Sequence, residues 1–141
     1  MRGMWTPKLD DRARLTLPVQ YRPELTNHVV VARGQDGCLS VYSQENYEAM
    51  MAAIDAASTT DEIVRQYQRW VHSNSADTEV DKLGRIIIAP RHRLWADIER
   101  ETVVIGVGNR LEIWSPERWE AYSPALDELF NEFNGSILPG A

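Results

Sequence analysis

The chain has 141 residues, with 15 Lys and Arg against 21 Asp and Glu, which gives a formal net charge of -6. Apolar residues make up 43% and charged residues 26% of the sequence, an ordinary globular composition that argues against intrinsic disorder. No apolar run approaches the roughly 20 residues of a membrane helix, and the single cysteine, Cys38, cannot form an internal disulfide. These features predict a cytoplasmic protein without membrane contact, and the net negative charge argues against nucleic-acid binding.

Residues 1–50 contain a turn followed by strand-like runs. Asp10 and Arg14 lie four positions apart in LDDRARLTLP, a turn that leads into an apolar run ending at Pro18. A short helix with Arg22 on its outer side is expected next. The remaining predicted elements are two strands, the glycine-containing hairpin turn between them and a closing helix, with the strands at 29–32 and 39–42 and the turn at 34–37.

Residues 51–78 are predicted to form a helical linker. Thr59-Thr-Asp-Glu62 fits a capping box, and apolar side chains recur on one face of the helix that follows. These side chains belong to Ile63, Val64, Tyr67, Trp70 and Val71. The tail of the linker, SNSAD at 73–77, is expected to be a polar connection.

Residues 79–122 repeat the order of the first half. VDKLGRIIIAPRHR at 80–93 aligns without a gap with LDDRARLTLPVQYR at 9–22, so that Asp81 matches Asp10 and Arg85 matches Arg14. The run ends at Pro90, and the following short helix carries Arg93 in the place of Arg22. Two strands at 103–107 and 111–114 follow, and Ser115 and Pro116 begin the closing helix. The match indicates a duplication.

The C-terminal segment, 123–141, is predicted to be a helix and a tail. An apolar stripe runs into it and is interrupted at Ser123-Pro124. The stripe consists of Trp119, Tyr122, Leu126, Leu129, Phe130 and Phe133. Like the apolar face of the linker, it is a candidate subunit interface or ordinary core. The end of the chain, from Asn134, is expected to fray.

The sequence therefore predicts an α+β tandem-repeat protein. Half-units of about 43 residues bury little surface on their own, so they should share one core or pack into neighbouring subunits. The predicted segments are the first repeat, the helical linker, the second repeat, and the C-terminal helix and tail, at 1–50, 51–78, 79–122 and 123–141.

Positive charge is confined to the regions around the two Asp-x-x-x-Arg turns. The net charges of the four successive segments 1–33, 34–78, 79–100 and 101–141 are +3, -5, +1 and -5. Lys8, Arg12 and Arg14 cluster around the first turn, and Lys82 and Arg85 around the second. An arginine fork suits phosphate oxygens and guanine edges, so a basic face for DNA is one interpretation. The other is a pair of surface ion pairs, each contributing less than about 1 kcal/mol.

The sequence shows no pattern typical of a metal site or of a catalytic site. His28, His72 and His92 have no metal-ligand spacing, and one cysteine cannot make a zinc finger. Asp10 and Asp11 are adjacent on an extended segment and should point to opposite faces, which does not suit an acid and base pair. No nucleophile and base are arranged for catalysis, so we predict a protein that is not an enzyme and has no cofactor and no metal.

The paired turns carry a family resemblance. DDRARLTLP at 10–18 and DKLGRIIIAP at 81–90 resemble the two Asp-x-x-x-Arg motifs of the MraZ family, bacterial transcriptional regulators related to the AbrB-type swapped-hairpin DNA-binding proteins. WTPKLD at 5–10, RGQD with LSVY at 33–42, and VVIG with LEIW at 103–114 extend the resemblance to roughly residues 1–122. The sequence departs from the family pattern at Ala13, usually Gly, and at Ala89, usually Pro, and Ala13 should stiffen the first turn.

The resemblance implies tandem β-rich half-barrels with short helices, assembled into a ring-like homo-oligomer in the cytoplasm and nucleoid. It implies binding to double-stranded DNA at short direct repeats in a promoter, and repression of the chain's own division and cell-wall gene cluster. Within this pattern Arg14 and Arg85 would contact DNA, with Lys8, Arg12 and Lys82 beside them, whereas Asp10, Asp81 and Gly84 would shape the loops. The alternative is an antitoxin-like or scaffold module of the same fold that binds another protein.

Overall fold

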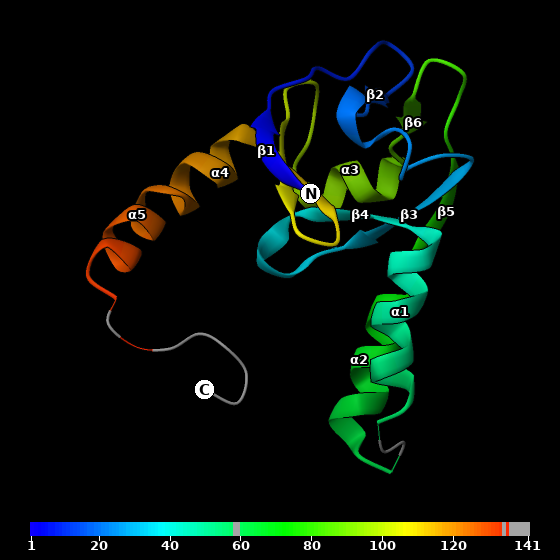
Figure 1. The fold of residues 1–141 in the computed structure, drawn as a ribbon, viewed down its shortest axis with the longest axis vertical. Helices are drawn as coiled ribbons and strands as arrows, with labels where there is room; N and C mark the ends of the chain where they lie inside the picture. Colours follow the sequence, from blue (N-terminus) through cyan, green and yellow to red (C-terminus); the bar gives the residue numbers. More distant parts are fainter. Residues whose placement is uncertain (58–59, 134, 136–141) are drawn as a thin grey trace.

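The structure is a computed structural model that describes residues 1–57, 60–133 and 135 (Figure 1). The described elements, in chain order, are β1 (Arg2–Trp5), β2 (Arg14–Thr16), the 3-10 turn η1 (Val19–Tyr21), β3 (His28–Arg33), the 3-10 turn η2 (Gln35–Gly37), β4 (Leu39–Ser43), α1 (Gln44–Asp55), α2 (Glu62–Ser73), β5 (Ala76–Glu79), β6 (Arg85–Ile87), α3 (Pro90–Ala96), β7 (Val103–Val107), β8 (Leu111–Trp114), α4 (Pro116–Tyr122) and α5 (Pro124–Asn131). The predicted α+β class is confirmed.

The strands form one six-stranded antiparallel sheet and one two-stranded ribbon. The sheet has the order β1-β7-β8-β4-β3-β5, and the ribbon consists of β2 and β6. Strands are exchanged between the two halves of the chain, because β1 pairs with β7 while β5 pairs with β3. The central pair β4–β8 and the ribbon also join one strand from each half. Each half therefore completes the sheet of the other.

The core lies between the ribbon and one face of the sheet. Leu15 and Ile86 from the ribbon are buried together with Val41 and Ile113 from the sheet, in a cluster that draws residues from both halves. Full burial of side chains of this size stabilises a fold by about 1.5–3 kcal/mol each. Because successive strand residues face opposite sides, Tyr42 points away from this core toward the second face of the sheet.

Two helical arms extend from the sheet (Figure 1). α1 and α2 form a hairpin at one end, and α4 and α5 leave from the other. The Ser43 and Ser115 hydroxyls accept hydrogen bonds from the first turns of α1 and α4, as expected of N-caps. The predicted interruption at Ser123 and Pro124 is confirmed, since α4 ends at Tyr122 and α5 begins at Pro124. No helix among the described residues is long and apolar enough to cross a membrane.

Two local expectations are changed by the structure, and a third falls mostly outside the described residues. The segment 73–77 was expected to be a polar connection, but its last two residues begin β5, because the edge of β3 offers free backbone groups for pairing. The N-cap of α2 is Asp61, whose side chain accepts from the Ile63 N–H at 3.1 Å, whereas Thr59 of the predicted capping box lies outside the described residues. The predicted fraying from Asn134 falls on residues that, except for Gly135, also lie outside them.

Candidate nucleic-acid interface

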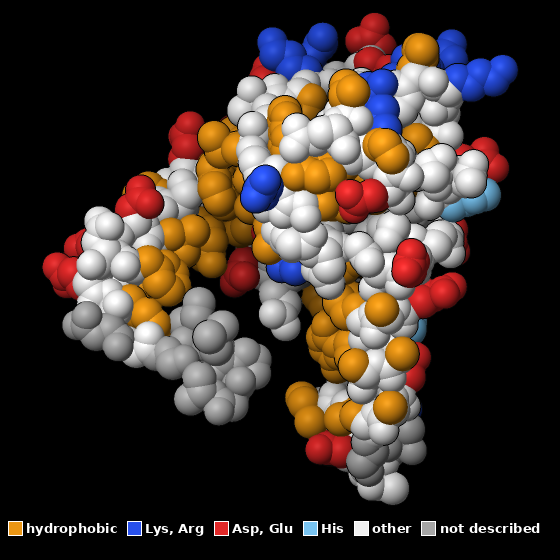
Figure 2. All heavy atoms as spheres, in the orientation of Figure 1, with side chains coloured by type: hydrophobic (Ala, Val, Ile, Leu, Met, Phe, Trp, Pro, Cys, Tyr) orange, Lys and Arg blue, Asp and Glu red, His pale blue; other side chains and the backbone are white. Residues whose placement is uncertain are grey.

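Two loops, residues 10–14 (loop 1) and 81–85 (loop 2), lie at the ends of the β2–β6 ribbon. In the antiparallel register Arg14 is opposite Ile87 and Arg85 is opposite Thr16, so the two motif arginines are only two ladder positions apart. Both loops are at the edge of the molecule farthest from the α1–α2 hairpin (Figure 1), and Figure 2 shows Lys and Arg side chains gathered at this edge, with acidic side chains among them.

Loop 1 is held by the Asp10 carboxylate. Oδ1 accepts hydrogen bonds from the backbone N–H groups of Arg12 and Arg14, both at 2.9 Å, and Oδ2 accepts from Arg14 Nε at 2.6 Å. The backbone N–H of Arg14 and, to a smaller extent, its guanidinium lower the pKa of Asp10. The carboxylate therefore stays ionised at neutral pH, and it fixes both the loop backbone and the base of the Arg14 side chain.

Loop 2 repeats this arrangement around Asp81. Its Oδ1 accepts from the N–H groups of Leu83 at 3.0 Å and Arg85 at 2.8 Å, and its Oδ2 accepts from Arg85 Nε at 2.8 Å. The backbone N–H of Arg85 is again the main group that lowers the pKa of the aspartate. Asp10 and Asp81 thus each hold their loop by three hydrogen bonds, and Arg14 and Arg85 each make a local ion pair.

The fourth position of each loop has a left-handed backbone. Gly84 has a φ of 75° and Ala13 a φ of 58°, a region that costs an alanine about 1 kcal/mol or more and costs glycine nothing. Both residues donate their N–H to the carbonyl of the loop aspartate, at 2.9 Å in loop 1 and 3.0 Å in loop 2. Ala13 therefore leaves the hydrogen-bonding pattern of the turn unchanged.

Each loop rests against an arginine from the other half. The Arg22 side chain lies over Gly84, where an added Cβ would come within 2.4 Å of Nε, and Arg93 lines the same hollow as Ala13. The expectation that Arg22 and Arg93 lie on the outer side of their helices was therefore wrong, since both are half-buried. Arg93 Nε donates to the Ile88 carbonyl at 3.0 Å, whereas Arg22 Nε is buried without a partner among the described residues.

The outward face of the ribbon links the two loops. Alternation places Leu15 and Ile86 in the core and turns Thr16 and Ile87 outward, with Ile87 57% exposed. The Arg14 and Arg85 side chains are only 27% and 24% exposed, and Arg85 Nη1 is 3.9 Å from Asp10 Oδ2. Asp10 therefore contacts the arginines of both loops. Sequence reasoning did not select Thr16 and Ile87, although the alternation of the ribbon strands was a signal that could have found them.

The remaining predicted basic residues have different surroundings. Arg12 and Lys82 are exposed at the loop tips, and neither makes an ion pair with any residue that the structure describes. Lys8 pairs with Glu101 at 3.5 Å, so its charge is partly compensated. The arrangement offers two fixed arginines and two unpaired cations along one edge. It can bind a row of anionic groups.

The histidines lie away from this edge and from one another. His28 is near Glu79, His72 contacts Asp55, and His92 is buried with its Nε2 2.7 Å from the Asn74 carbonyl oxygen. Across the described part of the chain, no three His, Cys, Asp or Glu side chains are grouped as ligands for a metal ion. Cys38 is buried directly before β4, where it packs with Val103 and Trp114.

Comparison with known proteins covers nearly the whole chain. Residues 1–70 and 73–134 match the family described as "MraZ protein, putative antitoxin-like". Proteins named "Transcriptional regulator MraZ" from Saccharopolyspora erythraea and Cutibacterium acnes are 41% and 40% identical, over 98% and 96% of this chain and 96% of each relative. A protein of the same name from Frankia alni is 38% identical over 98% of this chain and 96% of its own length.

The fold and the site define an α+β chain in which two Asp-x-x-x-Arg loops flank one ribbon, and its curated relatives are named as transcriptional regulators. Within that class, the match of the family model to both halves of the chain shows which family it is. The chain belongs to the MraZ family.

Proposed function

We propose that this chain is a sequence-specific DNA-binding regulator of transcription that reads DNA with loops 1 and 2 and the ribbon between them. The observation that carries the proposal is a hydrogen-bonding arrangement that occurs twice. Asp10 fixes Arg14 at one end of the ribbon, and Asp81 fixes Arg85 at the other. The names of the relatives point to the same activity. Arg14 and Arg85 are the proposed base or phosphate contacts, and Arg12, Lys82 and Lys8 are proposed to contact the backbone.

The ribbon supports the proposal by its shape. The major groove of B-DNA, about 12 Å wide, admits a two-stranded β-ribbon, and arginine can hydrogen-bond bidentately to guanine there. An arginine whose Nε is already held keeps its Nη groups in a fixed direction, which reduces the entropy lost on binding. Thr16 and Ile87, between the arginines, could contact bases through a hydroxyl and a methyl group.

The charge distribution supports binding by several copies together. One copy offers few cations for phosphate, so it should bind weakly at physiological salt. We propose a ring-like homo-oligomer whose copies engage short direct repeats in a promoter, which raises avidity without new contacts. The family resemblance further suggests swapped-hairpin half-barrels, a nucleoid location in the cytoplasm, and repression of the chain's own division and cell-wall gene cluster.

A second candidate function is an antitoxin-like or scaffold module that binds another protein. The family description contains the word antitoxin-like, and the exposed apolar side chains of α5 could serve such a partner. The two functions differ in their dependence on loops 1 and 2. Loss of DNA binding upon mutation of the loops favours the regulator, whereas a partner that binds equally well to a loop variant favours the module.

The proposal is tested by titrating binding to the chain's own upstream DNA against salt. Arg14→Ala combined with Arg85→Ala should abolish specific retardation while leaving the circular dichroism spectrum unchanged. Arg12→Ala and Lys82→Ala should instead lower affinity for all sequences and reduce the slope of log affinity against log salt by about 0.9 each, as expected for one lost phosphate contact.

Arg69→Ala is the matched control, because it removes one exposed cation from α2, at the far end of the molecule from the loops (Figure 1). It should change neither the affinity nor the slope. Undiminished specific binding by the Arg14 and Arg85 double variant would reject this interface.

A further inference from the structure

Arg12 and Leu83 occupy the same position of loops 1 and 2 but differ in chemistry. Each is the third residue of its loop, and its backbone N–H donates to Oδ1 of the loop aspartate, at 2.9 Å in loop 1 and 3.0 Å in loop 2. The same hydrogen bond therefore presents both side chains at the loop tips, where both are exposed. One end of the ribbon carries a guanidinium at this position, and the other carries an apolar side chain.

The exposed leucine belongs to an apolar row. Leu83, Arg85 and Ile87 are at every second position of loop 2 and β6, and Leu83 and Ile87 are 61% and 57% exposed. The matching row of loop 1 and β2 consists of Arg12, Arg14 and Thr16. Figure 2 shows apolar side chains among the basic ones at this edge. A single exposed leucine is common on protein surfaces, but this one lies in a row beside an arginine that we propose contacts DNA.

The fold does not require a leucine at the tip of loop 2. The core takes Leu15 and Ile86 from the ribbon, and Leu83 is outside the core clusters of the described chain. The turn itself is held by Asp81 and by the left-handed backbone of Gly84. The Leu83 side chain is thus available for contact with a ligand.

The thymine methyl group is the feature of DNA that this arrangement suits. In the major groove the base edges present hydrogen-bonding groups and, on thymine alone, a 5-methyl group that apolar side chains contact. Lys82, on one side of Leu83, suits a phosphate, and Arg85, on the other, suits a guanine edge. A leucine between these two contacts is held close to a base edge, where burial against a methyl group stabilises the complex.

We propose that Leu83 is a specificity-determining residue that contacts the 5-methyl group of a thymine next to the base pair read by Arg85. The inference rests on the proposed function and deepens it, because it assigns a base preference to one loop only. At the same position of loop 1, Arg12 offers its charge to phosphate and does not distinguish bases. The two ends of the ribbon therefore read DNA differently, and one chain binds its box in one direction.

Deoxyuridine replacement tests the contact, because it removes only the methyl group of thymine and keeps the base pairing. Each thymine in a duplex of the chain's own upstream DNA is replaced in turn, and affinity is measured by fluorescence anisotropy at one salt concentration. For the wild type, replacement of the contacted thymine should lower affinity about fourfold, the effect of one buried methyl group. Leu83→Ala should bind the thymine and deoxyuridine duplexes equally at that position. The comparison within each protein cancels any difference in the amount of active protein.

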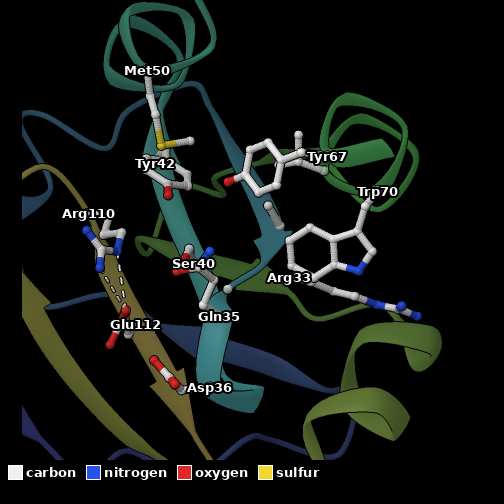
Figure 3. A pocket seen from close by; sticks show the side chains of 13 residues that line it. Arg33, Gln35, Asp36, Ser40, Tyr42, Met50, Tyr67, Trp70, Arg110 and Glu112 are labelled. Carbon is white, nitrogen blue, oxygen red and sulfur yellow. Dashed lines mark hydrogen bonds and ion pairs between the residues drawn. The ribbon is translucent and has the colours of Figure 1, made fainter. Parts of the chain in front are cut away.

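Ile63→Ala is the matched control, because Ile63 is 66% exposed in the first turn of α2. Figure 3 shows that α2 turns Tyr67 and Trp70 toward the side of the sheet on which Tyr42 lies, opposite the face that packs on the ribbon. This variant should keep both the affinity and the fourfold deoxyuridine effect of the wild type.

A second variant, Leu83→Arg, gives loop 2 the tip residue of loop 1. It should abolish the deoxyuridine effect and steepen the dependence of log affinity on log salt by about 0.9, as expected for one added phosphate contact. A Leu83→Arg protein that keeps the deoxyuridine effect of the wild type would contradict the proposed contact.

The outcomes separate this inference from the proposed function. A deoxyuridine effect that is equal in the wild type and in Leu83→Ala at every thymine would overturn the inference, since the methyl contact would then belong to another residue such as Ile87. Absence of any deoxyuridine effect in a wild type that binds its upstream DNA would overturn the inference and leave the proposed function in place. Failure of the wild type to bind that DNA would reject both.

Discussion

Loops 1 and 2 are built alike but are supported differently. In both, one aspartate oxygen accepts from two backbone N–H groups and the other from the arginine Nε. Loop 1 has a methyl group at Ala13, and the arginine beside it, Arg93, bonds to the Ile88 carbonyl. Loop 2 has Gly84 at that position, and Arg22 lies directly over it. The aspartate therefore determines the loop conformation, and the residue at the left-handed position determines how the opposite half packs against it.

The two aspartates also differ in the number of arginines that they contact. Asp81 pairs with Arg85 alone, whereas Asp10 pairs with Arg14 at 2.6 Å and lies 3.9 Å from Arg85. Loop 1 thus influences the arginine of loop 2, and the reverse contact is not present among the described residues. The two arginines are coupled through one carboxylate, although they come from different halves of the chain.

The largest effect is expected when glycine is removed from loop 2. Gly84→Ala places a Cβ within 2.4 Å of Arg22 Nε at a φ of 75°, so it should lower the free energy of unfolding by about 2–3 kcal/mol, from backbone strain together with displacement of Arg22. Urea unfolding measures the change. In an Arg22→Ala background the same substitution should cost only about 1 kcal/mol, the strain of the left-handed backbone. An equal cost in both backgrounds would show that Arg22 is not the obstacle.

A difference between the aspartates should appear in DNA recognition. Asp10→Asn removes the counter-charge of both arginines, so the ratio of specific to non-specific affinity should fall about tenfold. Asp81→Asn should reduce the ratio only a few-fold, since Arg85 keeps its contact with Asp10. Competition binding with unrelated DNA measures this ratio. The ratio is used because neutralising an aspartate near the DNA phosphates raises the affinity for all DNA sequences. Equal losses in the two variants would show that the two aspartates contribute equally to DNA recognition.

Elements within one half were readily predicted from the sequence. The strand pairs after each turn, the Ser115 cap and the break at Ser123 depend on neighbouring residues, and all were expected. β5 was missed because its polar residues gain a strand conformation only from the free edge of β3.

Contacts between the halves were beyond sequence reasoning. The pairing of β1 with β7, the approach of Arg85 to Asp10 and the position of Arg22 over Gly84 each depend on a partner far along the chain. Equivalent residues in the two halves look interchangeable in an alignment, and only their spatial neighbours distinguish them. The candidate residues of the site could therefore be named from the sequence, but the coupling between the two loops could not.

The reverse substitution in loop 1 should have a small effect. Ala13→Gly relieves a left-handed alanine, which favours the variant by about 1 kcal/mol, but it loses a methyl group packed on the core and adds freedom to the unfolded chain, which together cost a similar amount. The net change in the free energy of unfolding should stay within about 1 kcal/mol, in contrast to Gly84→Ala. A loss above 2 kcal/mol would mean that the methyl group, rather than Asp10, holds loop 1 in place.

The smallest expected difference between the two halves is in how the free energy of unfolding depends on pH. It arises in the segments that follow the ribbon strands. Tyr21 and His92 occupy matching positions in the two halves: the Tyr21 hydroxyl donates to the Arg2 carbonyl at 2.8 Å, and His92 Nε2 donates to the Asn74 carbonyl at 2.7 Å. Burial, together with the nearby charges of Arg33 and Arg91, lowers the pKa of His92 below its ordinary value of 6.5, so the folded protein holds the neutral ring.

The unfolded chain takes up a proton at His92 as the pH falls through 6.5, and the folded chain does so only at lower pH. The contribution of the neutral ring to stability is therefore fully present above pH 6.5 and decreases as the pH falls toward the folded pKa. His92→Gln keeps a donor for Asn74 but does not titrate. The free energy of unfolding of the wild type should fall relative to this variant between pH 7 and 5, measured by urea unfolding at each pH. A difference that is constant across this range would show that the second half, like the first with its tyrosine, is insensitive to pH at this position.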